Sequence, residues 1–438
     1  MVLAHGIGTR SDLPLPIWLA ALGAGTALMI SFVALAMLWR GPRLDRNAGA
    51  PLPRALTALA DARSTRLLLQ GLTLAATVLV CVVGFAGPRE AGLNLAPWAF
   101  FVTFWVGLVP ASLLFGPVWR VLNPLRLVHT ALAAVLRVDS ERGLRASPEP
   151  LGYWPAAASL AVFGWFELVY PGRTEPAATA VFVTAYALVH TSAALIYGSR
   201  WFERGDGFEV YSTLLGALSP LGRRSRDRAL VLRNPLHGLE TVAVGPGLTG
   251  VVVALVGTTA YDGLSRTAWW QANVPPGVLN ATLALLCAML LIGLVFLLGT
   301  WSLVGPDADG TADRPGIRPV AFAHTLVPIA AGYAIAHYFS LLIFDGQQTL
   351  ILASDPFADG ANLLGLTGST IDYTVISTAT IAAVQVTAIL LGHLVAAVGA
   401  HDRAVRLLPG AAAVRTQFPL LAAMIALTMG AVGLVFTA

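Results

Sequence analysis

The stretch GVLNATLALLCAMLLIGLVFLLGTWSL, residues 277–303, contains no charged side chain and decides the fold class. A helix needs about 20 apolar residues to cross the roughly 30 Å hydrocarbon core of a bilayer, because each residue rises about 1.5 Å. Residues 277–303 exceed that length without interruption. We therefore predict that they span a membrane.

Nine other apolar runs of similar length are spread along the 438-residue chain. They lie near residues 17–39, 67–86, 97–118, 153–171, 177–198, 242–261, 320–344, 375–400 and 417–437. Backbone groups in lipid must bond internally, and runs of this length suit helices better than the shorter, alternating strands of a barrel. The sequence predicts an all-α, polytopic transmembrane helix bundle of about ten spans, in one integral membrane domain over residues 1–438.

Composition agrees with a membrane protein. Hydrophobic residues make up 56% of the chain and charged residues only 11%, whereas about a quarter of the residues of a soluble domain are charged. In a soluble protein the net charge of +4 would suggest nucleic acid as a partner. Here the basic residues flank hydrophobic runs, where they set orientation, so we expect no nucleic-acid partner.

The orientation follows from the distribution of arginine, which accounts for all 27 basic residues. The connections after runs 1, 3, 5, 7 and 9 hold 6, 5, 7, 2 and 3 arginines, and the other side holds only Arg10, Arg89, Arg173 and Arg266. Cytoplasmic connections carry the excess of positive charge. We therefore expect an inner (plasma) membrane protein with both termini outside, whose cytoplasmic side contacts anionic lipids.

One cytoplasmic connection has the pattern of an interfacial helix. Residues 120–138, RVLNPLRLVHTALAAVLRV, place Arg120, Arg126 and Arg137 among apolar residues, which suits an amphipathic helix in the headgroup plane. A simple connection is the alternative. A second Asn-Pro-Leu tripeptide at 234–236 repeats the one at 123–125.

Ionisable residues inside the apolar runs are few, and such residues mark functional sites in membranes. Glu167 lies in FGWFELVYPG near the outer end of the fourth run; it is either functional or an interfacial carboxylate bonded to a Trp or Tyr. His324 and His393 lie at similar predicted depths in consecutive runs. Such a pair could bind a haem or a metal ion, and histidines hydrogen-bonded within the bundle are the alternative.

The longest outer connection is acidic. Residues 345–374 read DGQQTLILASDPFADGANLLGLTGSTIDYT and contain no basic residue. The predicted ligands of a divalent metal ion are its four aspartates with one histidine and one further aspartate nearby: Asp345, Asp355, Asp359, Asp372, His337 and Asp262. A metal-activated water there could attack an ester, with Glu167, His337 and Asp355 as catalytic residues. A solvated acidic loop is the alternative.

Several stretches carry a resemblance to a known family. They are AHGIGTRSDLPLPIW at 4–18, FWVGLVPASLLFGPVWRVLNPLR at 104–126, FAHTLVPIAAGYAIAHYFSLLIF at 322–344, SDPFADGANLLG at 354–365, IDYTVIS at 371–377 and AHDRA at 400–404. The chain resembles the bacterial, actinobacterial-type membrane proteins called fenitrothion hydrolases. The resemblance implies hydrolysis of a phosphorothioate triester, but it carries no catalytic residues over to this chain.

Three classes of function are therefore open. The first is a metal-assisted hydrolase of organophosphate-type esters with an outward-facing site. The second is a subunit of a larger membrane complex, respiratory or bearing a metal or haem. The third is a transporter, which ten spans favour and the scarcity of charge at the membrane midplane disfavours.

Overall fold

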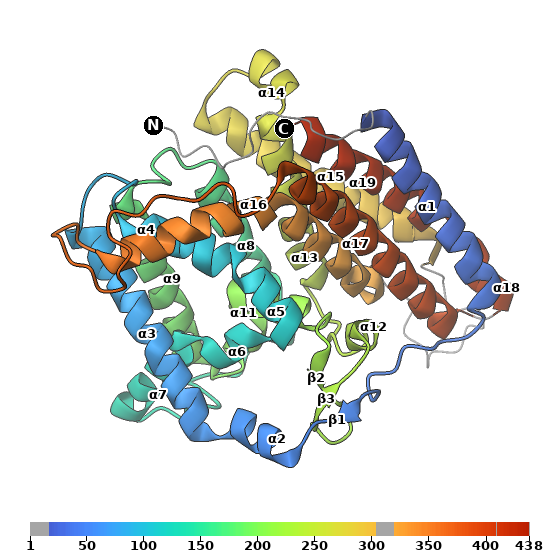
Figure 1. Ribbon diagram of the computed structural model, residues 1–438. Helices are drawn as coiled ribbons and strands as arrows, with labels where there is room; N and C mark the ends of the chain where they lie inside the picture. The colour runs from blue at the N-terminus through green and yellow to red at the C-terminus, as the bar shows by residue number, and fades with distance from the viewer. Residues whose placement is uncertain (1–16, 304–318, 409, 438) are drawn as a thin grey trace.

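The computed structural model describes residues 17–303, 319–408 and 410–437, which form a bundle of helices with one small sheet (Figure 1). The elements of the first half are α1 (Ile17–Leu38), β1 (Ala50–Pro51), α2 (Arg54–Asp61), α3 (Arg63–Ala86), α4 (Leu95–Pro97), the π-helix η1 (Trp98–Val106), α5 (Leu108–Phe115), α6 (Val118–Leu122), α7 (Pro124–Leu136), η2 (Glu149–Leu151), α8 (Trp154–Leu168), α9 (Pro176–Tyr197), α10 (Trp201–Arg204) and α11 (Gly207–Gly216). The second half contains β2 (Leu221–Arg223), β3 (Leu230–Leu232), α12 (Pro235–Leu239), α13 (Leu248–Arg266), α14 (Ala268–Asn273), α15 (Val278–Thr300), η3 (Trp301–Leu303), η4 (Pro319–Leu326), α16 (Val327–Ser354), α17 (Thr378–Leu407), α18 (Gly410–Arg415) and α19 (Phe418–Thr437).

Within these ranges, nine helical segments are long and apolar enough to cross a membrane. They comprise α1, α3, the α4–η1–α5 segment, α9, α13, α15 with η3, η4 with α16, α17, and the segment from α18 into α19. The prediction of a helical membrane protein is confirmed. The predicted run at 277–303 forms α15 and η3 with little change in its bounds.

The fourth predicted run is shorter than expected. Of residues 153–171 only Trp154–Leu168 form α8, and these 15 residues rise about 22 Å, less than the roughly 30 Å of a bilayer core. Turn residues at both ends of the run do not join the helix. Nevertheless α8 packs along α13: the Tyr153 amide donates to the Pro246 carbonyl at one end, and Glu167 lies near Asp262 at the other. It therefore covers much of the same layer as α13.

The arginine-rich connections meet at one end of the bundle. β1 from the connection at 39–66 pairs with β3 from that at 199–241, and β3 pairs with β2 (Figure 1). Arg406 donates to the Leu44 carbonyl, and Arg126 pairs with Glu209. These contacts bring four of the five arginine-rich connections together. Arg314 and Arg318 of the fifth lie outside the described residues.

The predicted acidic loop begins in a helix. α16 continues to Ser354, so the first ten residues of the segment 345–374 are helical. The apolar sequence TLILAS extends the helix, and Asp355-Pro356 ends it, since the residue before a proline avoids helical conformation. The C-terminal half of α16 crosses the α4 end of the bundle (Figure 1), where Leu352 packs against Val83 and Leu95.

The predicted interfacial helix at 120–138 begins later than expected. Asn123 separates α6 from α7, because its side chain accepts from the Leu125 amide and caps α7. α7 packs one side against the bundle: Leu125 and Ala133 are buried, whereas Val135 is 77% exposed. Its position relative to a headgroup layer stays a prediction.

Candidate functional site

A buried cluster of ionisable side chains joins α8, α13 and α16. His337 Nε2 lies 2.5 Å from Asp262 Oδ2. Arg266 Nε and Nη2 donate to the two oxygens of the same carboxylate at 3.0 and 3.1 Å. Asp262 and His337 are 3% and 5% exposed. The carboxylate thus holds a guanidinium on one side and an imidazole on the other.

A second carboxyl group faces this set. Glu167 is 9% exposed and lies close enough to Asp262 and Arg266 to interact electrostatically. The Tyr338 hydroxyl, one residue after His337, is its hydrogen-bonding partner. The sequence alternative of a carboxylate bonded to a Tyr therefore describes its contact correctly. We call Glu167, Asp262, Arg266 and His337 the outer cluster.

Local helix geometry explains how the outer cluster forms. Asp262 and Arg266 are four residues apart, so they share one face of α13. Tyr333 and His337 have the same spacing on α16, and their rings stack 5.9 Å apart. Gly263 lets Tyr333 approach, because a Cβ at this glycine would lie 2.6 Å from the Tyr333 hydroxyl. The sequence YDGLSR thus supplies the small residue and the charged residues of the α13–α16 contact.

The structure brings together two of the six residues predicted to bind a metal ion, His337 and Asp262. The other four are engaged elsewhere or stand apart. Asp355 accepts from the amides of Asp359 and Gly360, and Asp372 accepts from the amide and hydroxyl of Thr374, which lower its pKa. Among the described residues, no group of three His, Cys, Asp or Glu side chains is arranged to hold a metal ion.

The course of the chain also places three of these aspartates away from His337: Asp345, Asp355 and Asp359. Asp345 lies eight residues further along α16 than His337, about 12 Å along the axis. The Asp359 carboxylate caps the Ala361 amide. Asp355, predicted to be catalytic, therefore acts as a turn-forming residue beyond the end of α16.

His324 and His393 do not form a ligand pair in this structure. Gly399 of α17 lies at the level of Thr325, since a Cβ at Gly399 would be 4.0 Å from the Thr325 methyl carbon. His393 is six residues from Gly399, so it lies about 9 Å along the helix from the level of His324. The similar depths that the sequence predicted for His324 and His393 are therefore wrong, because α17 extends to Leu407.

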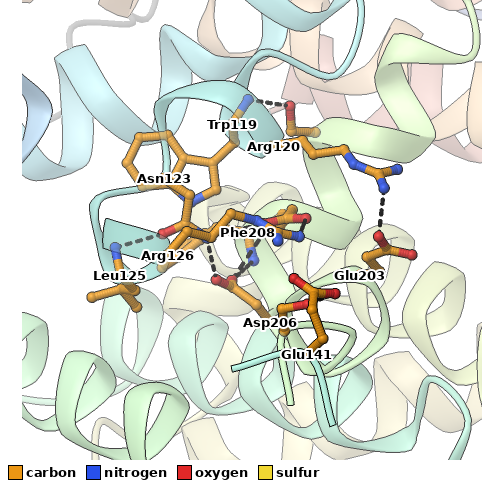
Figure 2. Close-up of polar contacts among 12 residues, drawn as sticks. Trp119, Arg120, Asn123, Leu125, Arg126, Glu141, Glu203, Asp206 and Phe208 are labelled. Carbon is orange, nitrogen blue, oxygen red and sulfur yellow. Dashed lines mark hydrogen bonds and ion pairs between the residues drawn. The ribbon is translucent and has the colours of Figure 1, made fainter. Parts of the chain in front are cut away.

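A second buried cluster lies near the arginine-rich end of the bundle and was not identified from the sequence (Figure 2). Asn123, Asp206 and Glu209 are each fully buried. Asn123 Nδ2 donates to Asp206 Oδ2 at 2.9 Å and to Glu209 Oε2 at 3.1 Å. Arg126 binds both oxygens of Glu209, and Tyr186 donates to Asp206 at 2.6 Å.

Hydrogen bonds within this second cluster explain why its carboxyl groups can be buried. Asp206 caps α11 by accepting from the Phe208 and Glu209 amides. Burial raises the pKa of Glu209, and the bound Arg126 lowers it by less. The repeated Asn-Pro-Leu tripeptide was the signal in the sequence for the role of Asn123 as a helix cap, because Asn234 caps α12 in the same way. Every oxygen of Asp206 and Glu209 has a donor, so we interpret this cluster as structural.

A mainly apolar cavity of about 240 Å³ lies beside the second cluster. Its walls come from α3, η1 and α9, with Phe100, Phe104 and Phe182 among the rings that line it. Tyr186 lines the cavity and also donates to Asp206. Such walls accept an uncharged, apolar molecule.

A third set of charges holds the ends of α1 and α17 together. Asp402 Oδ1 accepts from Trp39 Nε1 and from the amides of Arg43 and Leu44. His401 Nε2 contacts the Trp39 carbonyl at 3.0 Å. Next to them, Glu240 of the α12–α13 connection lies 3.4 Å from Arg403 Nη1 and 4.0 Å from His324 Nε2. We call Glu240, Arg403 and His324 the inner cluster.

Comparisons with protein-family models, curated proteins and solved structures found no match. The outer cluster is therefore interpreted from its own geometry.

Proposed function

We propose that the chain is a proton-linked membrane transporter that binds and releases a proton at the outer cluster. The observation that carries this proposal is the balance of charge around Glu167. Two carboxyl groups and one imidazole are buried together, and the guanidinium of Arg266, whose side chain is 22% exposed, lies against them. A buried set of this kind is stable when its charges cancel.

Charge balance leaves one exchangeable proton in the outer cluster. Arg266 compensates Asp262, so Glu167 and His337 must share the remaining charge. Either both are ionised, with the proton on His337, or both are neutral, with the proton on Glu167. Both forms have zero net charge and hold the same number of protons, so the proton can pass between Glu167 and His337 inside the bundle. Release of this proton to water leaves one negative charge on the cluster until another proton binds. Chains of Asp, Glu and His in this setting are typical of proton relays.

Proton flux into vesicles tests the proposal. Purified protein would be reconstituted into liposomes that contain a pH-sensitive dye, and the external medium would be acidified. We expect Glu167→Gln to slow the internal pH change at least tenfold, since an amide cannot carry the proton. Glu175→Gln, an exposed carboxyl at the start of α9, is the matched control and should behave as wild type. Wild-type flux equal to that of empty liposomes, or equal to that of Glu167→Gln, would overturn the proposal.

The orientation belongs to the same proposal. We infer ten crossings, an inner (plasma) membrane location and both termini outside. The meeting of four arginine-rich connections at one end of the bundle supports this orientation, because the cytoplasmic side carries the excess arginine. Anionic lipids would then contact that side.

A second candidate function is ester hydrolysis, which the resemblance implies. The contact of 2.5 Å between His337 and Asp262 favours it, because a carboxylate that orients an imidazole is the arrangement of a general base. A divalent ion at this position would draw on the same two residues as ligands. Hydrolysis of a nitrophenyl phosphotriester by purified protein, with added metal or with chelator, tests this candidate. Loss of activity in His337→Gln together with normal proton flux would favour the hydrolase.

A complex subunit with a bound haem or metal is the third candidate. Either His393 or His324 could supply a single axial ligand to a haem, but the two histidines are too far apart to bind the same iron. An optical spectrum and a metal analysis of the purified protein test it.

A further inference from the structure

Buried polar atoms without partners are concentrated in one part of the described chain. Nine buried side-chain nitrogen or oxygen atoms there lack a hydrogen-bond partner. Six of the nine lie on α16, α17 and the flanking η4 and α12–α13 connection: Glu240 Oε1, His324 Nδ1, Arg403 Nε, His393 Nε2, Tyr333 Oη and Thr349 Oγ1. The first five, which lie between the inner and outer clusters, form one series. Each such atom costs about 1–3 kcal/mol unless a water molecule satisfies it. A concentration of them indicates buried water.

The inner cluster has the geometry for a bridging water. Glu240 Oε1 and His324 Nε2 are 4.0 Å apart, too far for a direct hydrogen bond. One water within hydrogen-bonding distance of both atoms fits this separation. Arg403 Nε adds a donor from the same cluster. Water therefore finds both donors and acceptors here, as a buried water requires.

The next atom of the series lies deeper in the bundle. His393 Nδ1 lies 2.8 Å from the Ile389 carbonyl, an oxygen that can only accept, so Nδ1 carries the hydrogen. The lone pair of His393 is then on Nε2, which has no partner. Ile389 packs in the same buried cluster as Tyr333. His393 thus stands between the inner cluster and Tyr333.

Tyr333 connects this series to the outer cluster. Its hydroxyl has no partner and lies close to Gly263, next to Asp262. Its ring stacks on His337. From His324 to His337 the path follows 13 residues of η4 and α16, about 20 Å. Acceptors or donors occur at its inner end, its middle and its outer end.

We propose that water molecules occupy this series of atoms and form a proton route from the inner cluster to the outer cluster. The direction in which protons move along this route rests on the proposed function, but the presence of water in the route does not. At each step a protonated water or an imidazolium gives a proton to the next lone pair and receives another from the preceding group. No bond other than O–H or N–H changes, so the transfer needs no further reactant.

Accessibility of single cysteines to Ag⁺ tests the route without measuring transport. Ag⁺ is similar in size to water and binds thiolate, which forms where water reaches the sulfur. In a background with Cys81→Ala and Cys287→Ala, single cysteines would replace His324, His393 and Tyr333. Ag⁺ would be added to membranes, and the remaining free thiol would be labelled with a maleimide after denaturation.

Leu285→Cys is the matched control, because Leu285 is as buried as these residues but lies among apolar side chains of α13 and α15. We expect Ag⁺ to block His324→Cys and His393→Cys at least tenfold faster than Leu285→Cys. Ala397→Cys, one turn from His393, is a mild substitution and should also react if the histidine variants fold poorly. Equal rates at positions 397, 393 and 285 would overturn the route.

The two proposals fail in different ways. Reactive cysteines without proton flux would keep the hydrated route and refute the transporter. Proton flux that is lost in Glu167→Gln, combined with unreactive cysteines, would keep the outer cluster and refute this route. Proton flux abolished by His393→Phe but unchanged by Leu285→Phe would support both.

Discussion

Gly332 of α16 and Gly392 of α17 lie directly against each other. A Cβ on Gly332 would come within 3.1 Å of Gly392 Cα and within 2.4 Å of the Ala388 carbonyl oxygen. The two longest helices of the described chain therefore touch through their backbones. Close packing of small residues is a principal source of helix association in lipid. This contact fixes the positions of Tyr333 and His393, which follow the two glycines in sequence.

Gly332→Ala should destabilise the protein by about 1–3 kcal/mol, because one added methyl group forces the two backbones apart. The thermal midpoint of the purified protein in detergent measures the effect. Gly430→Ala on α19 is the control, since a Cβ there meets nothing within 4 Å. An unchanged midpoint for Gly332→Ala would contradict the close contact.

Asp262→Asn should destabilise the folded state by roughly 3–5 kcal/mol, because it leaves Arg266 without its buried counter-ion. Adding Arg266→Gln should restore part of this loss, since the second substitution removes the uncompensated charge. Unfolding by denaturant in detergent, measured for both single variants and the double variant, gives the coupling energy. Strictly additive effects would show that the two side chains do not interact.

Asn123→Ala should cost more stability than Asn234→Ala. Both asparagines cap a helix in the same Asn-Pro-Leu sequence, and loss of a cap costs about 1 kcal/mol. Asn123 also donates to two buried carboxylates. Without it Asp206 Oδ2 is left unsatisfied, which adds about 1–3 kcal/mol, whereas Glu209 Oε2 keeps Arg126 Nε as a donor. Thermal midpoints of the two variants provide the comparison, and equal losses would argue against the buried network of Figure 2.

The proposed orientation predicts which single cysteines an impermeant thiol reagent labels on intact cells. Ser369→Cys and Asn273→Cys should react from outside, and Arg226→Cys should react only after lysis, each in a background without Cys81 and Cys287. The sequence would also place Thr349 on the outer side, but it is 7% exposed and unsuitable for labelling. Arg406 donates to the Leu44 carbonyl and to Asp402, whereas the Arg226 side chain is 63% exposed, so Arg226 is the better cytoplasmic position. Labelling of Arg226→Cys without lysis would reverse the orientation.

The sequence by itself determined the long apolar helices. Residues 277–303 become α15 and η3 because an apolar chain in lipid must satisfy its backbone within the helix, whatever its neighbours are. Where turn residues or packing also act on a segment, the predicted bounds of its helix were less accurate. Turn residues shortened α8, and Asp345 was assigned to a loop although α16 continues past it.

Only the tertiary structure decided which polar residues meet. Asp262 and His337 are 75 positions apart, and nothing in either helix alone specifies that their side chains will face each other at 2.5 Å. The same holds for Asp206 and Glu209, which lie in an arginine-rich connection and which the fold buries against Asn123. Hydrophobicity acts on each segment separately, whereas a polar contact depends on the rotation and depth of two packed helices. Packing at positions such as Gly332 and Gly392 fixes that rotation and depth, so the clusters follow from the assembled bundle.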